Sequence, residues 1–282
     1  MKIRLIATFL MIGLFTGMSA QDNAAVKQRY VMRSSTFGIG KNNVYDTYLS
    51  PLEYRGIELR YTNESMRMTK MMNGNVSSQF LFNVNLTFNE NDSETADMYY
   101  GMASLSYALH YQFHVAKGLK ILAGPFIDLN AGFLYNTRNS NNPAQAKAYS
   151  SIGASGMAIY KFKIARYPMT ARYQMDIPLI GAAFSPQFGQ SYYEIFSLGH
   201  YDHNVLFTSL HNAPSIRQML TLDFPVGKTI LRAGYTCDIR QFKLNGLRSH
   251  AYSNIFMIGF VRNLYRLKGK YKASMPEKVT PF

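Results

Sequence analysis

The chain has 282 residues, 14% of them aromatic, with a formal net charge of +14 and a mean hydropathy of −0.14. Charged or amide residues interrupt every apolar run after the N-terminal one, which excludes a bundle of membrane-spanning helices. The single cysteine, Cys237, excludes an intramolecular disulfide. It lies on the apolar face of an expected strand, which indicates a small hydrophobic residue rather than a nucleophile.

Residues 1–20 predict a cleaved secretory signal peptide. Lys2 and Arg4 form its positive start, and small residues lead to a cleavage site after Ala20. The apolar stretch Leu5–Phe15 is shorter than the roughly 20 residues of a membrane-spanning helix. A secreted chain makes nucleic acid an unsuitable partner for the positive charge. Anionic lipid headgroups, including those of lipopolysaccharide, are the better partner, and plain solvation of loops is the alternative.

Residues 21–29 are a polar leader, expected in the periplasm, and alternating strands are expected after it. The first half of the chain predicts strands at Tyr30–Gly40, Glu53–Tyr61, Met66–Met72, Val76–Phe88, Tyr99–His114 and Leu119–Phe133. Between them we expect turns or loops at Thr62–Ser65, Asn73–Asn75, Glu90–Asp97, Ala116–Gly118 and Asn136–Lys147.

The second half predicts further strands separated by shorter connections. They are expected at Ile152–Tyr160, Met169–Ile177, Ser191–Leu198, Val205–His211, Ser215–Phe224, Thr229–Gln241 and Ala251–Leu264. Pro225–Lys228 reads as a tight turn and Lys243–His250 as a polar loop. Residues 267–282 form a basic tail without a pattern, for which we expect disorder.

These elements predict an all-β fold, an antiparallel transmembrane β-barrel over residues 30–266. Counting from Glu53 gives about twelve strands, within a range of about 10–14, because such barrels have even strand numbers, short periplasmic turns and long outer loops. A secreted soluble sandwich is the alternative. Strands in globular proteins centre on about five or six residues, and the alternation here runs longer.

Charged residues recur at the inward positions of this barrel. The lumen-lining set is Glu58, Arg60, Lys120, Asp128, Arg172, Asp176, Arg217, Asp223, Arg232 and Asp238. Buried charges persist only when they are paired and hydrogen-bonded, so the set predicts a network that fills and braces the lumen. The alternative is a small hydrophilic pore, with a slight preference for anions because of the extra arginines.

Two short groups of residues have side chains that could catalyse a reaction or bind a metal. Ser209 and His211 place a hydroxyl two residues from an imidazole, as a nucleophile and its base require. Outer-membrane acyl hydrolases carry such a pair on one strand in the order His-x-Ser, whereas this chain has Ser-x-His. His200, Asp202 and His203 cluster in an expected loop, but scattered loop histidines are common. We expect no cofactor and no metal, and an enzyme is the less favoured class.

Three phrases resemble the uncharacterised family DUF3316 of Gram-negative envelope proteins: Asp46–Leu52, Thr208–Asn212 and Ser249–Asn254. The resemblance implies an outer-membrane barrel, assembled by the barrel-assembly machinery and surrounded by outer-membrane lipid, and it implies no mechanism. The leading hypothesis is a structural or transport-type barrel with a charged lumen. The alternatives are a lipid acyl hydrolase and a surface-binding module acting through loops 136–147 and 181–204.

Overall fold

The computed structural model describes residues 30–140, 142–165, 167–227, 229–265 and residue 282. The expected signal peptide, the leader and residues 267–281 of the expected tail lie outside these ranges. Within them, no helix is long and apolar enough to cross a membrane.

The described chain is almost entirely β-strand. The strands are β1 (Tyr30–Asp46), β2 (Ser50–Met68), β3 (Val76–Asn91), β4 (Asp97–Ala116), β5 (Leu119–Asn136), β6 (Ala144–Ile164), β7 (Tyr167–Phe184), β8 (Val205–Ser209), β9 (Ser215–Val226), β10 (Thr229–Leu244) and β11 (Leu247–Tyr265). Two short helices accompany them, the 3₁₀-helix η1 (Met71–Gly74) and α3 (Tyr192–Phe196).

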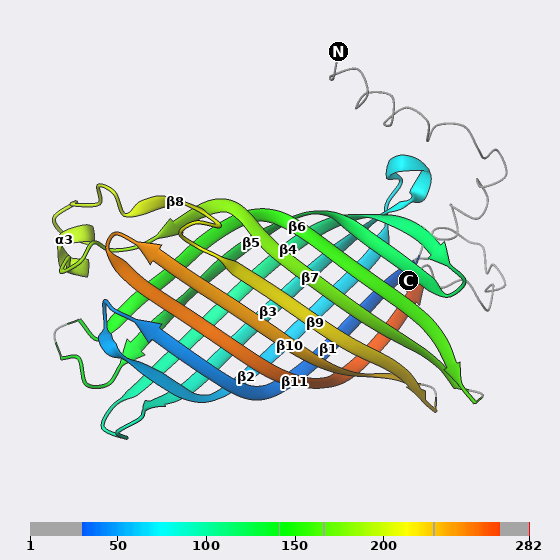
Figure 1. Cartoon of the computed structure of the whole chain (residues 1–282), viewed down its shortest axis with the longest axis horizontal. Coiled ribbons are helices and arrows are strands. Elements are labelled where there is room, and N and C mark those ends of the chain that lie inside the picture. The colour runs from blue at the N-terminus through cyan, green and yellow to red at the C-terminus, as the bar shows by residue number, and fades with distance from the viewer. Residues whose placement is uncertain (1–29, 141, 166, 228, 266–281) are drawn as a thin grey trace, which may run out of the picture.

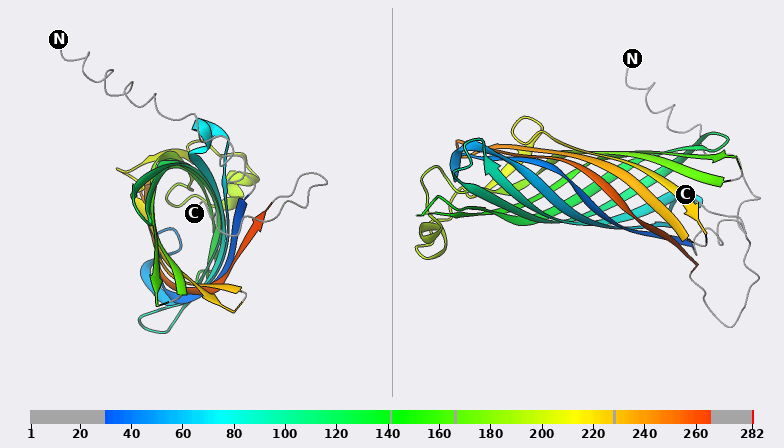
Figure 2. Two further views of the ribbon diagram at one scale, coloured as in Figure 1. Left: turned by 90° about the vertical axis from the view of Figure 1, so that its right-hand side faces the viewer. Right: turned by 90° about the horizontal axis from the view of Figure 1, so that it is seen from below.

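Ten of these strands close into an antiparallel barrel (Figures 1 and 2). Each strand pairs with its neighbour in sequence from β1 to β7, then β7 pairs with β9, and β11 pairs back with β1. β8 stands outside the ring and pairs only with the last residues of β7, Ile180–Phe184. We call the end that carries the connection between β7 and β9 the loop end, and the opposite one the terminal end.

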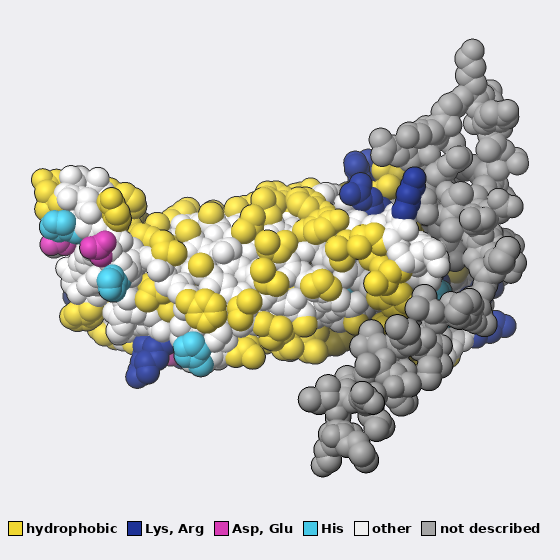
Figure 3. Space-filling view, turned by 90° about the horizontal axis from the view of Figure 1, so that it is seen from above, with side chains coloured by type: hydrophobic (Ala, Val, Ile, Leu, Met, Phe, Trp, Pro, Cys, Tyr) yellow, Lys and Arg dark blue, Asp and Glu magenta, His cyan; other side chains and the backbone are white. Residues whose placement is uncertain are grey.

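The barrel is apolar outside and polar inside, the reverse of a soluble protein. In β1, Phe37 is 64% exposed on the outer face, whereas its neighbour Thr36 is 3% exposed on the inner face. Hydrophobic side chains cover much of the outer wall in Figure 3, and charged side chains gather toward its two ends. Such a wall suits contact with lipid, because hydrocarbon must be met by apolar groups while the backbone bonds within the sheet.

Apolar clusters lie toward both ends of the polar interior. The terminal end holds a buried cluster that includes Met66, Leu122, Ile159 and Val261. The loop end holds another, which includes Tyr54, Met98 and Leu134. The charged side chains therefore occupy a middle section between the two clusters.

The all-β barrel is confirmed, but the ring contains ten strands, at the lower limit of the expected range. The turn expected at Thr62–Ser65 is wrong, because β2 runs through it without a break. Its polar residues are strand residues of the inner face, paired in register with β1 and β3. The count of twelve begins at Glu53 and includes a strand at Val205–His211. In the structure that strand, β8, lies outside the ring, and β1, which precedes Glu53, belongs to it.

Two further expectations are wrong for local reasons. The strand expected at Ser191–Leu198 is the helix α3, because Ser191 and Glu194 form a capping box at its N-terminus. The loop expected at Lys243–His250 is a two-residue hairpin turn. Asn245 and Gly246 both have positive φ, 50° and 75°, as such a turn requires.

Candidate functional site: a charged lumen

Glu64 is the best-connected carboxylate of the interior. It lies on β2, is 1% exposed, and faces arginines from two other walls. Arg172 of β7 donates from both terminal nitrogens, at 2.8 and 2.6 Å, and Arg232 of β10 donates at 2.6 Å. β2 and β7 are five places apart in the ring of ten, so the first pair joins opposite walls.

Arg232 has two further polar partners, the carboxylate of Asp223 and the hydroxyl of Ser34. Asp223 of β9 accepts from its Nε at 2.6 Å and from Nη2 at 2.7 Å. Ser34 accepts from Nη1 at 2.9 Å. We call Glu64, Arg172, Arg232 and Asp223 the Glu64 cluster. Its two cations and two anions neutralise one another, as buried charges must.

Amide side chains connect this cluster to the next ion pair. Gln79 donates to Glu64 and also to Gln174, at 2.5 and 2.8 Å. Gln174 in turn donates to Asp176 at 3.0 Å. Asp176 and Arg217 pair at 2.7 Å on the neighbouring strands β7 and β9. The contacts therefore run along the barrel axis as well as across it.

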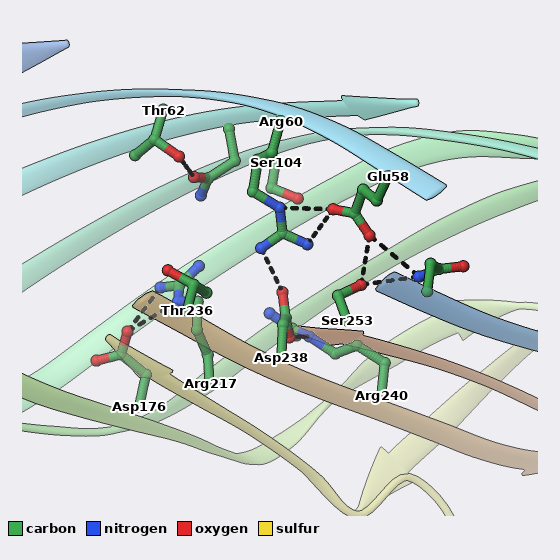
Figure 4. A network of polar contacts seen from close by, with 12 residues as sticks. Glu58, Arg60, Thr62, Ser104, Asp176, Arg217, Thr236, Asp238, Arg240 and Ser253 are labelled. Atoms are coloured by element: carbon green, nitrogen blue, oxygen red, sulfur yellow. Dashed lines mark hydrogen bonds and ion pairs between the residues drawn. The ribbon is translucent and has the colours of Figure 1, made fainter. Parts of the chain in front are cut away.

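A third group lies nearer the loop end (Figure 4). Arg60 lies between Glu58, at 2.6 Å, and Asp238, at 3.4 Å. Arg240 donates to Asp238 at 2.9 Å and to Asp128 at 3.2 Å. Ser106 donates to Asp128 at 2.6 Å and accepts from Arg217, at 3.2 Å, which joins this group to the preceding pair.

One unbroken chain of polar contacts thus runs from Asp223 to Glu58. Among the described residues it contains six carboxylates and five guanidinium groups: Asp223, Glu64, Asp176, Asp128, Asp238 and Glu58, with Arg232, Arg172, Arg217, Arg240 and Arg60. The excess of arginine on which an anion preference was expected is therefore not present. The near balance suits a braced interior better than a selective pore.

Nine of the ten lumen-lining residues expected from the sequence belong to this series of polar contacts. The exception is Lys120, which lies half-buried at the terminal end, on the inward side of β5. Sequence reasoning missed Glu64 because four consecutive polar residues read as a turn. Its place two residues beyond Thr62 and four beyond Arg60 on the same strand face was the signal that could have revealed it.

Ser209 and His211 lie outside the barrel wall, at the loop end. Ser209 is the last residue of β8, and His211 belongs to the following turn, so the two do not share a strand. Ser209 Oγ is nevertheless 2.5 Å from His211 Nδ1. In the described part of the chain, no carboxylate forms an ion pair with His211, and no three metal-ligating side chains gather, His200, Asp202 and His203 included.

Helix α3 fastens the long loop to the barrel rim. The hydroxyl of Tyr192 accepts a hydrogen bond from the backbone N–H of Ala146 at 2.7 Å. Burial raises the pKa of Tyr192 to about 12. Beside it, exposed aromatic side chains include Tyr193 and Phe196. The loop is thus anchored by one ring and presents others to its surroundings.

The chain is similar to several solved structures. The transport unit of the autotransporter AIDA-I from Escherichia coli is 9% identical, with a TM-score of 0.49, over 93% of this chain and 97% of that one. The translocator domain of the autotransporter NalP from Neisseria meningitidis is 10% identical, with a TM-score of 0.38, over 91% and 93%. An outer membrane channel from Pseudomonas putida F1 is 8% identical, with a TM-score of 0.37, over 89% and 100%.

No curated protein matches the chain. A family model described as "Protein of unknown function (DUF3316)" matches residues 5–271.

Proposed function

The chain belongs to the DUF3316 family, and from that premise we propose that this member is an integral outer-membrane β-barrel with a closed lumen, a structural element rather than an open pore. In the proposed orientation the terminal end faces the periplasm and the loop end faces outward. Short turns at the terminal end and the 30 or so residues between β7 and β9 at the other support this orientation.

The apolar outer wall supports insertion into a membrane. Exposed Phe37, Ile258 and Phe256 lie on adjacent strands, and similar side chains continue around the ring. A soluble protein of this size rarely exposes a continuous apolar surface of more than a few hundred Å². Lipid is the partner that fits such a wall.

The observation that carries the closed lumen is the contact between Glu64 and Arg172. Two charge-assisted hydrogen bonds at 2.6 and 2.8 Å join opposite walls, so the pair lies across the path of a solute. Arg240 and Asp128, from walls four places apart, cross the lumen again at 3.2 Å. Apolar clusters lie on either side of these groups along the barrel.

Planar-bilayer recording of the purified, folded protein tests the proposal. We expect no stable single-channel conductance from the wild-type chain. A double variant, Glu64→Ala with Arg172→Ala, removes both partners of the contact that crosses the lumen and should give small open events. A large, stable conductance of the wild-type protein would overturn the closed-lumen proposal.

A lipid acyl hydrolase is the second candidate function, favoured by the hydrogen bond between Ser209 and His211. In such an enzyme the imidazole takes the hydroxyl proton while the oxygen attacks an ester carbonyl. The test is hydrolysis of phospholipid esters by the folded protein in detergent micelles. Ser209→Ala should abolish hydrolysis, with Ser215→Ala as the matched serine control; equal activity of both variants would remove this candidate.

A further inference from the structure

Residues 185–214 connect β7 to β9 and contain α3 and β8; we call them the rim segment (Figure 1). Within α3 only Ile195 is buried. The exposed side chains of the segment include Phe188, Phe196, Tyr201, Val205 and Phe207. Single apolar residues are normal on a protein surface, but a concentration of large ones marks an interaction surface. The rim segment is therefore expected to contact a partner.

The outer face of β8 continues the apolar outer wall of β7. Val205 pairs in register with Phe184, and the side chains of paired residues lie on the same face of a sheet. Phe207 pairs with Ala182 in the same way. Between these two β7 partners, Ala183 is buried and faces inward. Val205 and Phe207 are therefore on the outer side, where they are 73% and 64% exposed.

The aromatic rings of α3 join this face through Phe184. The ring of Phe196 stacks on that of Phe184, with the centroids 6.4 Å apart and the planes at 25°. The ring of Tyr192 stacks on Phe196 at 5.9 Å. Phe196 is nevertheless 72% exposed. Aromatic side chains are enriched at the boundary between membrane and water, where one ring meets hydrocarbon and headgroups, so this group suits that boundary.

Asn212 closes the free edge of β8 to another strand. Its side-chain nitrogen donates to the carbonyl oxygen of Phe207 at 2.9 Å, and its side-chain oxygen accepts from the backbone N–H of Ser209 at 2.8 Å. The amide thus occupies groups that a further strand would bond. These bonds also suit lipid, because an unpaired backbone group is costly in hydrocarbon. The face of β8, rather than its edge, is left for a partner.

Hydrogen bonds from two hairpin turns hold the rim segment in place. Asn245, in the turn between β10 and β11, donates to the carbonyl oxygens of Ser185 at 3.1 Å and His203 at 2.9 Å. Tyr48, in the turn between β1 and β2, donates to the carbonyl oxygen of Gln190 at 2.9 Å. The segment is therefore bonded to the rim of the barrel, and its apolar face is kept outward.

The charge of the rim segment decides which part of a lipid it can contact. Its sequence contains no lysine or arginine and two carboxylates, those of Glu194 and Asp202. In Figure 3, carboxylate and histidine side chains lie beside hydrophobic ones at this end of the barrel. A segment without cationic side chains does not attract anionic headgroups. Its contact with lipid is therefore with the acyl chains.

We propose that the rim segment is an interfacial lipid anchor. Its outer face lies at the outward boundary of the bilayer, with Val205, Phe207 and Phe196 against the acyl chains of the lipid next to β7. The inference rests on the proposed membrane insertion, because this face continues the wall that meets lipid. Ser209 follows Phe207 on the same face, so its hydroxyl lies at the same boundary.

Tryptophan fluorescence of the folded protein in phosphatidylcholine vesicles tests the anchor. The chain contains no tryptophan, so a single introduced one is the sole reporter. Phe207→Trp and Phe196→Trp are the test variants. Phe256→Trp, on the outer wall, is the control for lipid, and Ser93→Trp, exposed in the acidic connection between β3 and β4, is the control for water. Bromine atoms on the acyl chains quench only a tryptophan that lies against those chains.

We expect brominated lipid to remove most of the emission of both test variants, as it does for Phe256→Trp. Their emission should also be shifted to shorter wavelength than that of Ser93→Trp, and aqueous iodide should quench them less. Raising the salt from about 0.1 M to about 1 M shortens the Debye length from about 10 Å to about 3 Å and should leave the lipid quenching unchanged. Addition of anionic phosphatidylglycerol should also leave it unchanged.

Two results would overturn the anchor: iodide quenching of Phe207→Trp as strong as that of Ser93→Trp, or lipid quenching that depends on salt or anionic lipid. Short-wavelength emission without lipid quenching would assign the face to a second copy of the chain and would overturn it too.

Phe256→Trp separates this inference from the proposed function. If brominated lipid does not quench that variant, membrane insertion fails and the anchor fails with it. If Phe256→Trp is quenched and both test variants are not, the anchor alone fails. The gel mobility of the folded form checks that each variant has closed.

Discussion

Glu64 and Arg172 form a two-point ion pair between opposite walls of a ten-stranded barrel, with neither side chain more than 4% exposed. Arg232 contacts the same carboxylate from a third wall. Because these groups are shielded from water, each depends on the others for compensation of its charge. The pair therefore links the stability of the barrel to the closure of its lumen.

Glu64→Ala should destabilise the folded barrel by about 3–5 kcal/mol, because it leaves two buried arginines without their shared anion. The measurement is urea unfolding in lipid vesicles, followed by the shift in gel mobility between folded and unfolded forms. Glu53→Ala is the control, since its ion pair with Arg55 is exposed and should contribute no more than about 1 kcal/mol. Equal costs for the two variants would contradict the bracing role.

Gly259→Ala should weaken the contact between the first and last strands. A Cβ at Gly259 of β11 would overlap the backbone carbonyl oxygen of Ser35 on β1, so the two strands must separate locally. Such overpacking costs about 1–3 kcal/mol. The refolding yield and the unfolding midpoint in urea would measure it.

Gly156→Ala is the matched control for that substitution. A Cβ at Gly156 meets nothing within 4 Å, so the substitution should change the free energy of unfolding by no more than about 1 kcal/mol. If both alanine variants unfold at the same urea concentration, the close approach of β1 and β11 does not limit stability.

The capping box of α3 should respond to acid. Hydrogen bonds from the backbone N–H and hydroxyl of Ser191 hold the pKa of the Glu194 carboxyl below its usual range. A lowered folded pKa contributes stability above the ordinary glutamate pKa, about 4.3, and that contribution is lost as the pH falls through the folded value. Amide NMR of Ser191 should therefore show a transition below about pH 4.3.

Glu194→Gln provides the control for the acid transition. The glutamine carbonyl oxygen can still accept from the N–H of Ser191 but does not titrate, so the Ser191 amide signal should become independent of pH in that range. A transition of unchanged size in this variant would show that another group causes it.

The alternation of apolar and polar residues was enough to predict the barrel. In Val76–Phe88 and Thr229–Gln241 apolar and polar residues alternate, because only the side of a strand that faces lipid must be apolar. The same rule explains the errors. A polar interior makes a polar run ambiguous, and Thr62–Ser65 differs from a turn only through its pairing with β1 and β3.

The partners in the lumen were beyond sequence reasoning for a related reason. The alternation along each strand places Arg172 and Arg232 on the inner face. Whether both reach Glu64 depends on the tilt of the strands and the closure of the ring. The pair at Ser209 and His211 was visible in the sequence, whereas the position of β8 outside the ring was not. That position depends on β7, which pairs with β9 up to Asp176 and with β8 from Ile180 onward.

The seating of Glu64 against β7 and β10 also constrains how the barrel assembles. Its nearest neighbours in the sheet, β1 and β3, supply no cation to it, so a growing sheet of adjacent hairpins leaves the carboxylate without a guanidinium until distant strands arrive. A half-built sheet must keep its inner face hydrated, and the water can leave only when the ring closes. We therefore expect closure of the ring and dehydration of the lumen to occur together, because a dry lumen that lacked a strand would hold unpaired buried charges.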